Sequence, residues 1–402
     1  MARSHSPQIA RFRALIALLS GATLLLTLGG CAQNTAGPEP TSEIVASAKV
    51  EPIERVWPQR IRVSLMGDML PHDSVNANAK TGGSYDYQKY FSQIRQIWST
   101  SELVYCNQEA PSAPSVKVTG YPLFNAPAKF AEDLHAAGCN AVNLANNHSV
   151  DRGQAAAVAT RELWNGINPL LLTGVNRSAE EQRKVSYTEI DGVRFALLGY
   201  TMLSNQGFAD WNLNHTRNDA LVRAQMAEAR ANADIVLVSM HWGVEDTNTP
   251  NNTQRNYAKY LSGLGADVII GMHPHVVQPV EWLQRSDGKQ TLVWYSLGNM
   301  LSSQLTLAQR VSGVGMFDVL VEGESIRVVD PQFVPTFMYY YWTPAQQSAG
   351  NLLARKDLML YLLWDAQKYL DLARFNTTVE KQYAYLHKAL GSAVSIYRPE
   401  SR

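Results

Sequence analysis

Six short polar clusters in this sequence carry residue types that could do chemistry, and each directly follows an apolar run. They are Gly67-Asp68, Asn107-Gln108-Glu109, Asn146-Asn147-His148, His241-Trp242-Gly243, His273-Pro274-His275 and Ser296-Leu297-Gly298-Asn299. The clusters combine carboxylates, a neutral amide oxygen and imidazole nitrogens, from Asp68, Glu109, Asn147, His241, His273 and His275. This mixture of donors suits one or two divalent transition ions.

The apolar runs before these clusters have the composition of buried strands. They cover 61–66, 103–106, 141–145, 235–240, 268–270 and 292–295. In an open α/β sheet, ligands gather outside the carboxyl ends of the strands. We therefore expect clusters that are far apart in the sequence to converge on one site, where Gly67 and Gly271 would let the backbone pass close beneath a ligand.

Each cluster also has an ordinary structural interpretation. Asp68 and Asn147 could cap helices, Glu109 could be an exposed loop charge, and the histidines could be satisfied core or surface groups. Taken one at a time, these interpretations are preferable. The repetition of the pattern, with two imidazoles on a rigid His-Pro-His turn, favours a shared metal centre.

Taken in order, the motifs resemble those of the CapA family of bacterial capsule or poly-γ-glutamate synthesis proteins. They are Gly67-Asp68-Met69-Leu70, Asn107-Gln108-Glu109, Leu144-Ala-Asn-Asn-His148 with Asp151 and Gly153, His241-Trp242-Gly243 with Glu245, Gly271-Met-His-Pro-His275 and Tyr295-Ser-Leu-Gly-Asn299. The resemblance implies a calcineurin-like metallophosphatase fold over 61–335, a layered α-β-β-α sandwich of mixed sheets. It also implies a location in the bacterial cell envelope and a role in making or exporting an anionic polymer.

The resemblance further implies roles for individual residues. The metal ligands would be Asp68, Glu109, Asn147, His241, His273 and His275, holding one or two ions among Mn, Zn, Fe and Mg. His148 would protonate the leaving group, and Asp151 could orient it, although capping the next helix is the favoured role of Asp151. Contacts with substrate at the pocket rim would come from Trp242, Glu245 and Asn299, with simple packing as the alternative for Trp242.

Two positions depart from the wider metallophosphatase pattern. Leu70 stands where that pattern has a histidine, and His72 lies too far along to replace it automatically. Glu109 stands where the pattern has a bridging Asp. Two functions therefore stay open: a metal-dependent hydrolase of a cell-envelope polymer or phosphorylated intermediate, and a non-catalytic accessory that binds the polymer or a membrane synthase.

The amino terminus has the pattern of a lipoprotein signal over residues 1–30. Arg3, Arg11 and Arg13 precede an apolar stretch, and Leu28-Gly29-Gly30 leads to Cys31. Cleavage before Cys31 and acylation of its thiol would anchor the protein to a membrane outside the cytoplasm, with residues 31–60 as lipidated cysteine and flexible tether. The alternatives are an ordinary cleaved signal and a membrane-spanning helix.

Composition limits the class of partner. The chain has 35 basic and 35 acidic residues, so it carries no basic footprint for nucleic acid. Its hydrophobic share of 46% is enough for a packed core.

Helix-like spacing alternates with the strands and predicts β-α-β organisation at 87–97, 128–137, 155–164, 221–231 and 257–264. Hairpin turns at Asp191-Gly192 and 286–288 would make the sheets mixed. Residues 336–402 are expected to form a C-terminal helical extension, with helices at 352–372 and 379–390.

Two cysteines remain, Cys106 and Cys139. If their strands are parallel neighbours, the two residues lie at opposite strand ends, roughly 13 Å apart by strand rise and beyond bridging distance. We expect two small buried residues rather than a disulfide.

Overall fold

The computed structural model describes residues 58–400. The expected signal and the expected lipidation of Cys31 concern residues outside this range. The first described strand, β1, begins at Gln59 and so takes up the last residues assigned to the tether.

The larger sheet has nine strands in the order β16-β15-β14-β1-β4-β5-β6, with β13 paired to β1 and β17 to β15. Its strands are β1 Gln59–Met69, β4 Leu103–Gln108, β5 Ala141–Asn143, β6 Leu171–Thr173, β13 Asn299–Leu301, β14 Val311–Glu322, β15 Ser325–Tyr341, β16 Lys356–Leu362 and β17 Ser395–Ile396. β1, β4, β5 and β6 run parallel, whereas β14, β15 and β16 join by antiparallel pairing. The sheet is therefore mixed.

The second sheet has six strands in the order β11-β12-β10-β9-β8-β7. They are β7 Ser186–Ile190, β8 Val193–Thr201, β9 Ile235–His241, β10 Val268–Met272, β11 Val280–Gln284 and β12 Gln290–Trp294. Both predicted hairpins are confirmed at its edges, β7-β8 and β11-β12. At the first turn, Asp191 and Gly192 both have positive φ, which is the backbone of a type I′ turn.

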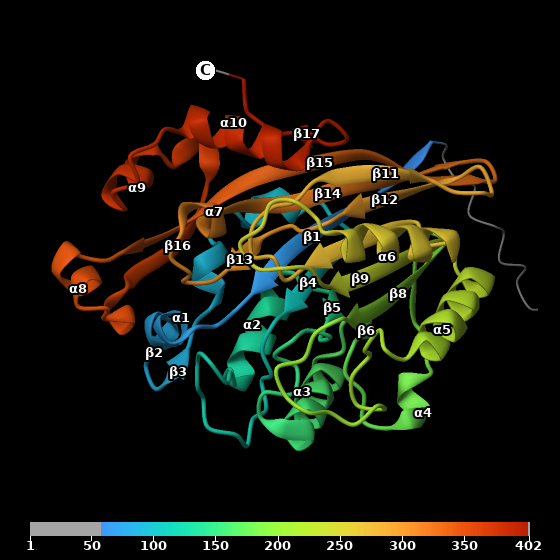
Figure 1. Cartoon of the computed structure of the whole chain (residues 1–402), viewed down its shortest axis with the longest axis horizontal. Helices are drawn as coiled ribbons and strands as arrows, with labels where there is room; N and C mark the ends of the chain where they lie inside the picture. Colours follow the sequence, from blue (N-terminus) through green and yellow to red (C-terminus); the bar gives the residue numbers. More distant parts are fainter. Residues whose placement is uncertain (1–57, 401–402) are drawn as a thin grey trace, which may run out of the picture. The chain divides into compact units, whose positions relative to one another are not determined.

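The two sheets face each other across a shared apolar core, with helices on their outer sides (Figure 1). α2 (Ala128–Ala137) and α3 (Gly153–Ile167) cover the larger sheet, and α5 (Asp219–Asn232) and α6 (Asn252–Gly263) cover the smaller one. Between the sheets, the Tyr105 hydroxyl lies 2.6 Å from the Ser239 hydroxyl. This packing holds the strand ends of both sheets together.

Shorter elements complete the fold. They are α1 Asp73–Ala79, β2 Lys80–Thr81, β3 Ser84–Tyr85, α4 Ala179–Gln182, α7 Leu307–Arg310, α8 Pro344–Ser348, α9 Gln367–Leu372 and α10 Val379–Leu390. The four helices expected between 128 and 264 are confirmed as α2, α3, α5 and α6. The helix expected at 87–97 is instead two 3-10 turns, Gln88–Phe91 and Arg95–Trp98.

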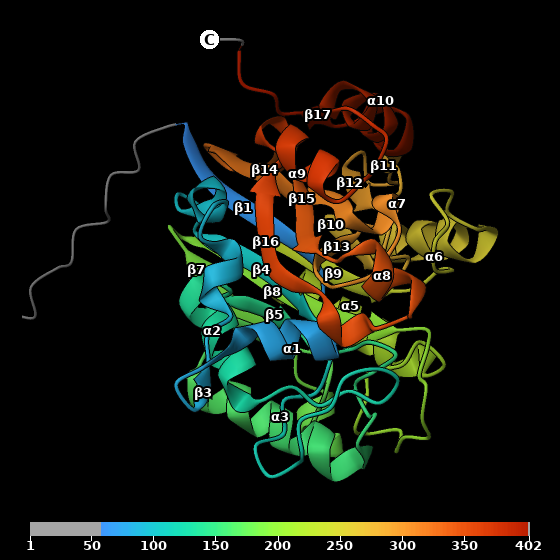
Figure 2. The same ribbon diagram turned by 90° about the vertical axis from the view of Figure 1, so that its left-hand side faces the viewer.

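The expected C-terminal helical extension is only partly helical. The boundary at 335 falls inside β15, and β16 pairs with β15, so this region completes the larger sheet (Figure 2). The helix expected at 352–372 is wrong, because 356–362 is the strand β16. Buried and partly buried positions alternate over 358–362 and put Leu358, Leu360 and Leu362 in the core, the period of a strand. The helix expected at 379–390 is confirmed as α10, which packs on β15 together with α9.

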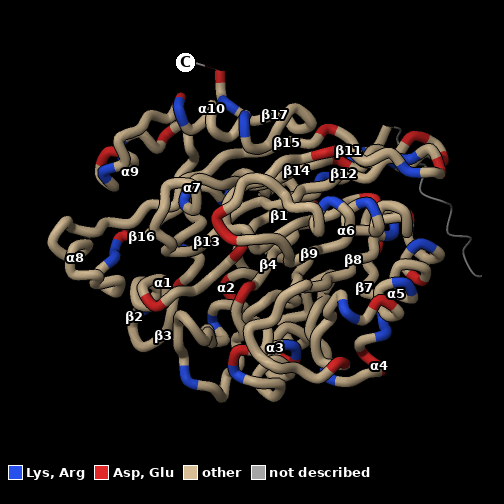
Figure 3. The backbone as a smooth tube through the Cα atoms, in the orientation of Figure 1, with Lys and Arg blue, Asp and Glu red and all other residues tan. Residues whose placement is uncertain are grey.

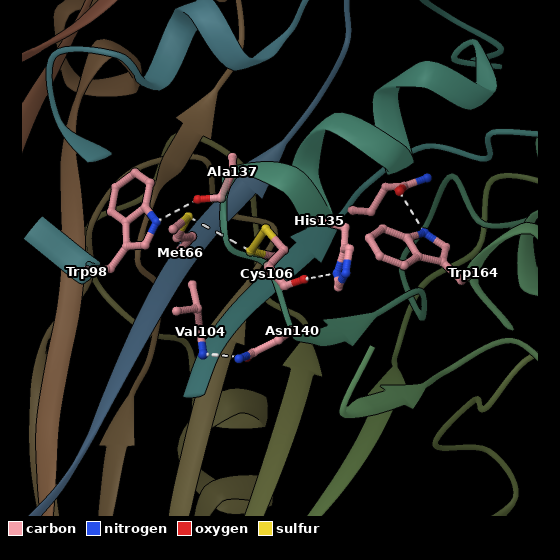
Figure 4. Close-up of a disulfide and its surroundings, with 10 residues drawn as sticks. Met66, Trp98, Val104, Cys106, His135, Ala137, Asn140 and Trp164 are labelled. Carbon is pink, nitrogen blue, oxygen red and sulfur yellow. Dashed lines mark hydrogen bonds between the residues drawn. A yellow bond between two sulfur atoms is a disulfide. The ribbon is translucent and has the colours of Figure 1, made fainter. Parts of the chain in front are cut away.

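Cys106 and Cys139 form a disulfide with a Cα–Cα distance of 5.7 Å, so the expectation of two free cysteines is wrong (Figure 4). Cys139 is not part of a strand: it lies in the turn between α2 and β5, where Gly138 has φ 127°. A separation calculated from strand rise therefore does not apply to it. Met66 packs beside the bridge, with its Sδ 3.8 Å from Cys106 Sγ.

Within residues 58–400, no helix combines the length and apolar character that crossing a membrane requires. Lysine and arginine are interspersed with aspartate and glutamate over the backbone (Figure 3).

Candidate functional site

The predicted clusters meet where the carboxyl ends of strands from both sheets come together. From the larger sheet come Asp68 in β1, Glu109 directly after β4 and Asn147 in the turn after β5. From the smaller sheet come His241, the last residue of β9, and the His273-Pro274-His275 turn after β10. All of the predicted ligands are buried.

Asp68 joins the two sheets. Its Oδ1 accepts a hydrogen bond of 2.8 Å from Asn107 Nδ2, and its Oδ2 accepts one of 3.1 Å from the backbone N–H of His273. Oδ2 also lies 3.1 Å from His275 Nδ1. Asp68 thus holds the His-Pro-His turn by one backbone contact and one ring contact.

Glu109 lies among the histidines. Its Oε1 is 3.5 Å from His241 Nε2 and 3.8 Å from His275 Nε2. His241 Nε2 also lies 2.9 Å from Asn147 Oδ1. The rings of His241 and His273 lie close together, with centroids 4.8 Å apart.

Several of these buried atoms have no hydrogen-bond partner among the described residues: both carboxylate oxygens of Glu109, Nδ1 of His241 and Nδ1 of His273. Two triads offer ligand atoms that lie within 4.8 Å of one another: Glu109 with His273 and His275, and Asp68 with Glu109 and His241. Buried polar groups without partners are rare, and carboxylate with imidazole is a common metal-binding set. The residues fit one or two divalent ions.

The electrostatics of the cluster show what such an ion would neutralise. Burial, reinforced by the charge of Asp68, raises the pKa of Glu109 well above its usual range. Burial lowers the pKa of His241, and burial together with His275 lowers the pKa of His273 to about 4. Burial alone would lower the pKa of His275 as well, but its contact with Asp68 outweighs burial and the pKa is raised.

The backbone under the site is tightly packed and strained. A side chain at Gly67 would meet the carbonyl oxygen of Gly298 at 2.0 Å, and one at Gly271 would meet that of Tyr295 at 2.1 Å. These two glycines therefore let neighbouring backbone segments approach each other closely beneath the cluster. His273 and His275 have φ of 97° and 58°, in the left-handed region that side-chain-bearing residues seldom adopt.

His148 and Asp151 form a pair beside the ligands. Asp151 Oδ2 lies 2.7 Å from His148 Nδ1 and also accepts a 2.8 Å hydrogen bond from the backbone N–H of Phe124. α3 begins after Arg152 without a side-chain cap, so the favoured interpretation of Asp151 as a helix cap is wrong. With Nδ1 directed to Asp151, Nε2 is the nitrogen of His148 left for proton transfer.

The three expected rim residues have different surroundings. Trp242 is fully buried, donates from Nε1 to the backbone carbonyl of Tyr295 at 2.9 Å and stacks on the Tyr295 ring. These contacts are those of the alternative role, simple packing. Glu245 is exposed, and its charge contributes to the raised pKa of Glu109. Asn299 is buried opposite Asp68 in the β1-β13 pairing, and its Oδ1 has no hydrogen-bond partner among the described residues.

Leu70 packs in a small apolar cluster with Ala110 and Phe124. The His72 ring lies edge-on to Phe124, and its Nδ1 is 3.2 Å from the carbonyl oxygen of Leu70. His72 is not a member of either ligand triad. The first motif therefore contributes Asp68 but no histidine to the candidate centre.

Two residues beside the predicted ones were not assigned roles from the sequence. Asn107 holds Asp68 and is itself held by Asn143 Nδ2 at 2.9 Å, while Asn205 Nδ2 lies 3.2 Å from His148 Nδ1. Asn107 had a signal, since it belongs to the same polar cluster as Glu109. Asn205 follows β8 without a recognisable motif, and only the packing of the two sheets brings it close.

Comparison with known proteins places the site in a family context. Residues 62–304 match the family model described as Bacterial capsule synthesis protein PGA_cap. The chain is 34% identical over 194 residues to the PGA biosynthesis protein CapA of Bacillus subtilis (strain 168), covering 47% of this chain and 50% of that protein. It is 26% identical over 294 residues to the Capsule biosynthesis protein CapA of Bacillus anthracis, covering 70% and 69% respectively.

A solved structure described as a novel phosphatase from Mycoplasma pneumoniae is similar with a TM-score of 0.43 and 12% sequence identity, covering 69% of this chain and 94% of that one. The family match covers more than half of the chain and includes the strand-end clusters from Asp68 to Asn299. The chain belongs to the PGA_cap family of bacterial capsule synthesis proteins.

Proposed function

We propose that this protein is a metal-dependent hydrolase that cleaves a phosphoester-type bond during synthesis or export of an anionic capsule polymer resembling poly-γ-glutamate. The observation that carries this proposal is Glu109, a buried carboxylate with two unpartnered oxygens among three histidines. An acid in this position is costly to keep charged unless a cation pairs with it.

A divalent ion at this centre would stabilise negative charge on the transferred group and lower the pKa of a water molecule bound to it. The protein residues provide the remaining parts. Asp68 holds the His-Pro-His turn in place, and Asn147 fixes the orientation of the His241 ring. These contacts hold the side chains of the centre in fixed orientations before an ion binds.

His148 is the proposed general acid. Its contact with Asp151 fixes the tautomer that has Nε2 available, and the Phe124 ring packs edge-on against it with a centroid distance of 4.7 Å. His148 is 6% exposed, so a proton held there is shielded from bulk water. This arrangement suits protonation of a departing oxygen.

We further propose a lipid-anchored location in the bacterial cell envelope, outside the cytoplasm. The sequence around Cys31 supports it, as does the Cys106–Cys139 bridge, because structural disulfides persist mainly in oxidising compartments. The polymer and its membrane synthase would be the partners at that location.

A non-catalytic accessory that binds the polymer or the membrane synthase is the second candidate. The observation that favours it is Leu70, whose place in an apolar cluster leaves the first motif without a histidine ligand. A structural ion would then be held by Asp68 and Glu109 together with the three histidines of the centre, His241, His273 and His275.

Metal analysis of the purified full-length protein, followed by assays on phosphodiesters, phosphomonoesters and γ-glutamyl amides, tests the two candidates. We expect one or two divalent ions per chain and metal-dependent release of phosphate or alcohol. Stoichiometric metal without hydrolysis of any substrate would replace the hydrolase by the accessory function.

A further inference from the structure

A second site lies near the end of β15, in a cavity of about 360 Å³. Its walls come from α7, the end of β15, α8 and the segment after α9. All of these except α7 lie within 336–402, the range expected to form a C-terminal extension. Tyr340, Trp342 and Phe375 supply aromatic surface, and Arg310 and Arg374 supply charge. This volume is in the range of small-molecule sites in proteins.

Arg310 is the most informative residue of this cavity. It is only 4% exposed, and its Nη2 has no hydrogen-bond partner among the described residues. Its Nε donates to the carbonyl of Met338 at 2.8 Å, and its guanidinium lies 3.9 Å from the Tyr340 ring centroid. Burial lowers its pKa to about 10, so Arg310 remains charged at neutral pH.

The charge in the cavity is not neutralised. Arg374 donates from Nη2 to the carbonyl of Trp342, and no aspartate or glutamate lines the cavity. Among the described residues, neither Arg310 nor Arg374 is within 4.0 Å of a carboxylate. A buried guanidinium with an unused donor and no counter-ion favours an anion as the missing partner.

The cavity is connected to the candidate metal centre by a short chain of hydrogen bonds. The Tyr340 hydroxyl donates to the carbonyl of Gln304 at 2.8 Å, and Gln304 Oε1 accepts from Asn299 Nδ2 at 2.6 Å. Asn299 pairs with Asp68 across β13 and β1. Gln304 and Asn299 thus link the cavity wall at Tyr340 to Asp68 of the candidate metal centre.

We propose that this cavity is a carboxylate-binding site for an organic acid with an apolar stem, such as one residue of an acidic polymer. The two oxygens of a carboxylate match the few free donors here better than the three terminal oxygens of a phosphate monoester. The aromatic walls pack against the aliphatic stem. The identification with polymer rests on the proposed function, whereas carboxylate binding itself needs no metal and no catalysis.

Calorimetric titration of the full-length protein with glutarate tests the site, with neutral glutaramide and inorganic phosphate as comparison probes. We expect glutarate to bind, glutaramide not to bind, and phosphate to bind more weakly. Binding should survive chelation, because it does not involve the metal centre. Tighter binding of phosphate, or equal binding of glutaramide, would overturn the carboxylate assignment.

Variants locate the binding. Arg374→Asn keeps a residue that tolerates the φ of 61° and should weaken glutarate binding by about 10-fold or more, the usual effect of losing a charged hydrogen bond. Ala373→Leu, which narrows the cavity and keeps both arginines, should also weaken it. The matched control is Arg95→Asn, because Arg95 is an exposed arginine that likewise donates to a backbone carbonyl.

Arg310→Met tests the buried charge, with the melting temperature as a check of folding. If Arg374→Asn and Ala373→Leu bind glutarate like the wild type, the site is not this cavity. If chelation abolishes binding, glutarate binds at the metal centre and the proposal fails. If the wild type binds glutarate but hydrolyses none of the substrates, that result would contradict only the proposed function.

Discussion

Asp151 Oδ2 contacts both His148 Nδ1, at 2.7 Å, and the backbone N–H of Phe124, at 2.8 Å. One carboxylate oxygen therefore fixes the ring of the proposed acid and the loop whose Phe124 ring covers it. Because Asp151 follows His148 by only three residues, the pair is built locally, and the loop comes to it from a different part of the chain.

His148→Ala should retain metal, because the predicted ligands are untouched, and should lose roughly 100 to 10,000-fold in turnover on a substrate with a poor leaving group. An aryl phosphoester whose leaving group departs without protonation should lose much less. Turnover on the two substrates, with metal content measured in parallel, checks this. Equal losses on both would show that His148 binds substrate without donating a proton.

Asp151→Asn serves as the graded control for His148→Ala. It keeps the size of the side chain but weakens the hold on the Nδ1 proton, so we expect a smaller loss with the same dependence on leaving group.

Removal of metal should lower the melting temperature of the wild type, because an ion that binds only the folded state stabilises it. His273→Ala/His275→Ala should hardly respond to chelator, since this variant lacks two members of the triad with Glu109. Differential scanning fluorimetry with and without chelator measures the response. The control is His387→Ala on α10, which removes a histidine outside the centre. Equal shifts in the double variant and the wild type would count against the site.

Metal binding should release protons. The pKa of Glu109 and that of His275 are both raised, so these two groups hold protons to a higher pH than usual in the metal-free folded protein, and a bound ion would displace those protons. His241 and His273 have lowered pKa values and are already neutral, so they release none. Affinity should therefore rise with pH, and the stability that metal confers should be lost as pH falls through the Glu109 pKa.

Calorimetry in buffers with different ionisation enthalpies counts the released protons. Glu109→Gln should bind metal more weakly and release fewer protons than the wild type, and an unchanged count would assign the protons to another group.

Cys106→Ala/Cys139→Ala should lower the free energy of unfolding by about 3 to 4 kcal/mol, the loop-entropy effect expected for a bridge across 33 residues. Urea denaturation measures it, and adding reductant should destabilise the wild type but not the variant. A reductant effect that persists in the variant would mean that the bridge is not its source.

Cys31→Ser should release the protein from the membrane fraction, because acylation of Cys31 would be lost. Fractionation and immunoblotting check the location. The matched control is Cys106→Ala/Cys139→Ala, which removes the other two cysteines and should remain membrane-bound. Retention of Cys31→Ser in the membrane would refute the anchor.

The sequence by itself determined the strands and the chemistry at their ends. Apolar runs such as 235–240 and 268–270 became β9 and β10, and the polar residues after them, His241 and His273, lie in one cluster with Asp68 and Glu109. The strand predictions succeeded because buried strands can be recognised from local periodicity. The prediction of a shared site succeeded because ligands generally gather at the carboxyl ends of strands in such sheets.

Tertiary structure decided what depends on register, turns and partners. The disulfide required the turn at Gly138, and the strand at 356–362 required an edge of β15 to pair with. Asp151 could have capped α3 or oriented His148, and only the position of Phe124 and the start of α3 distinguish the two. The anion-binding cavity around Arg310 needed residues from four segments. Such contacts are absent from local sequence patterns, because they depend on which surfaces the folded chain brings together.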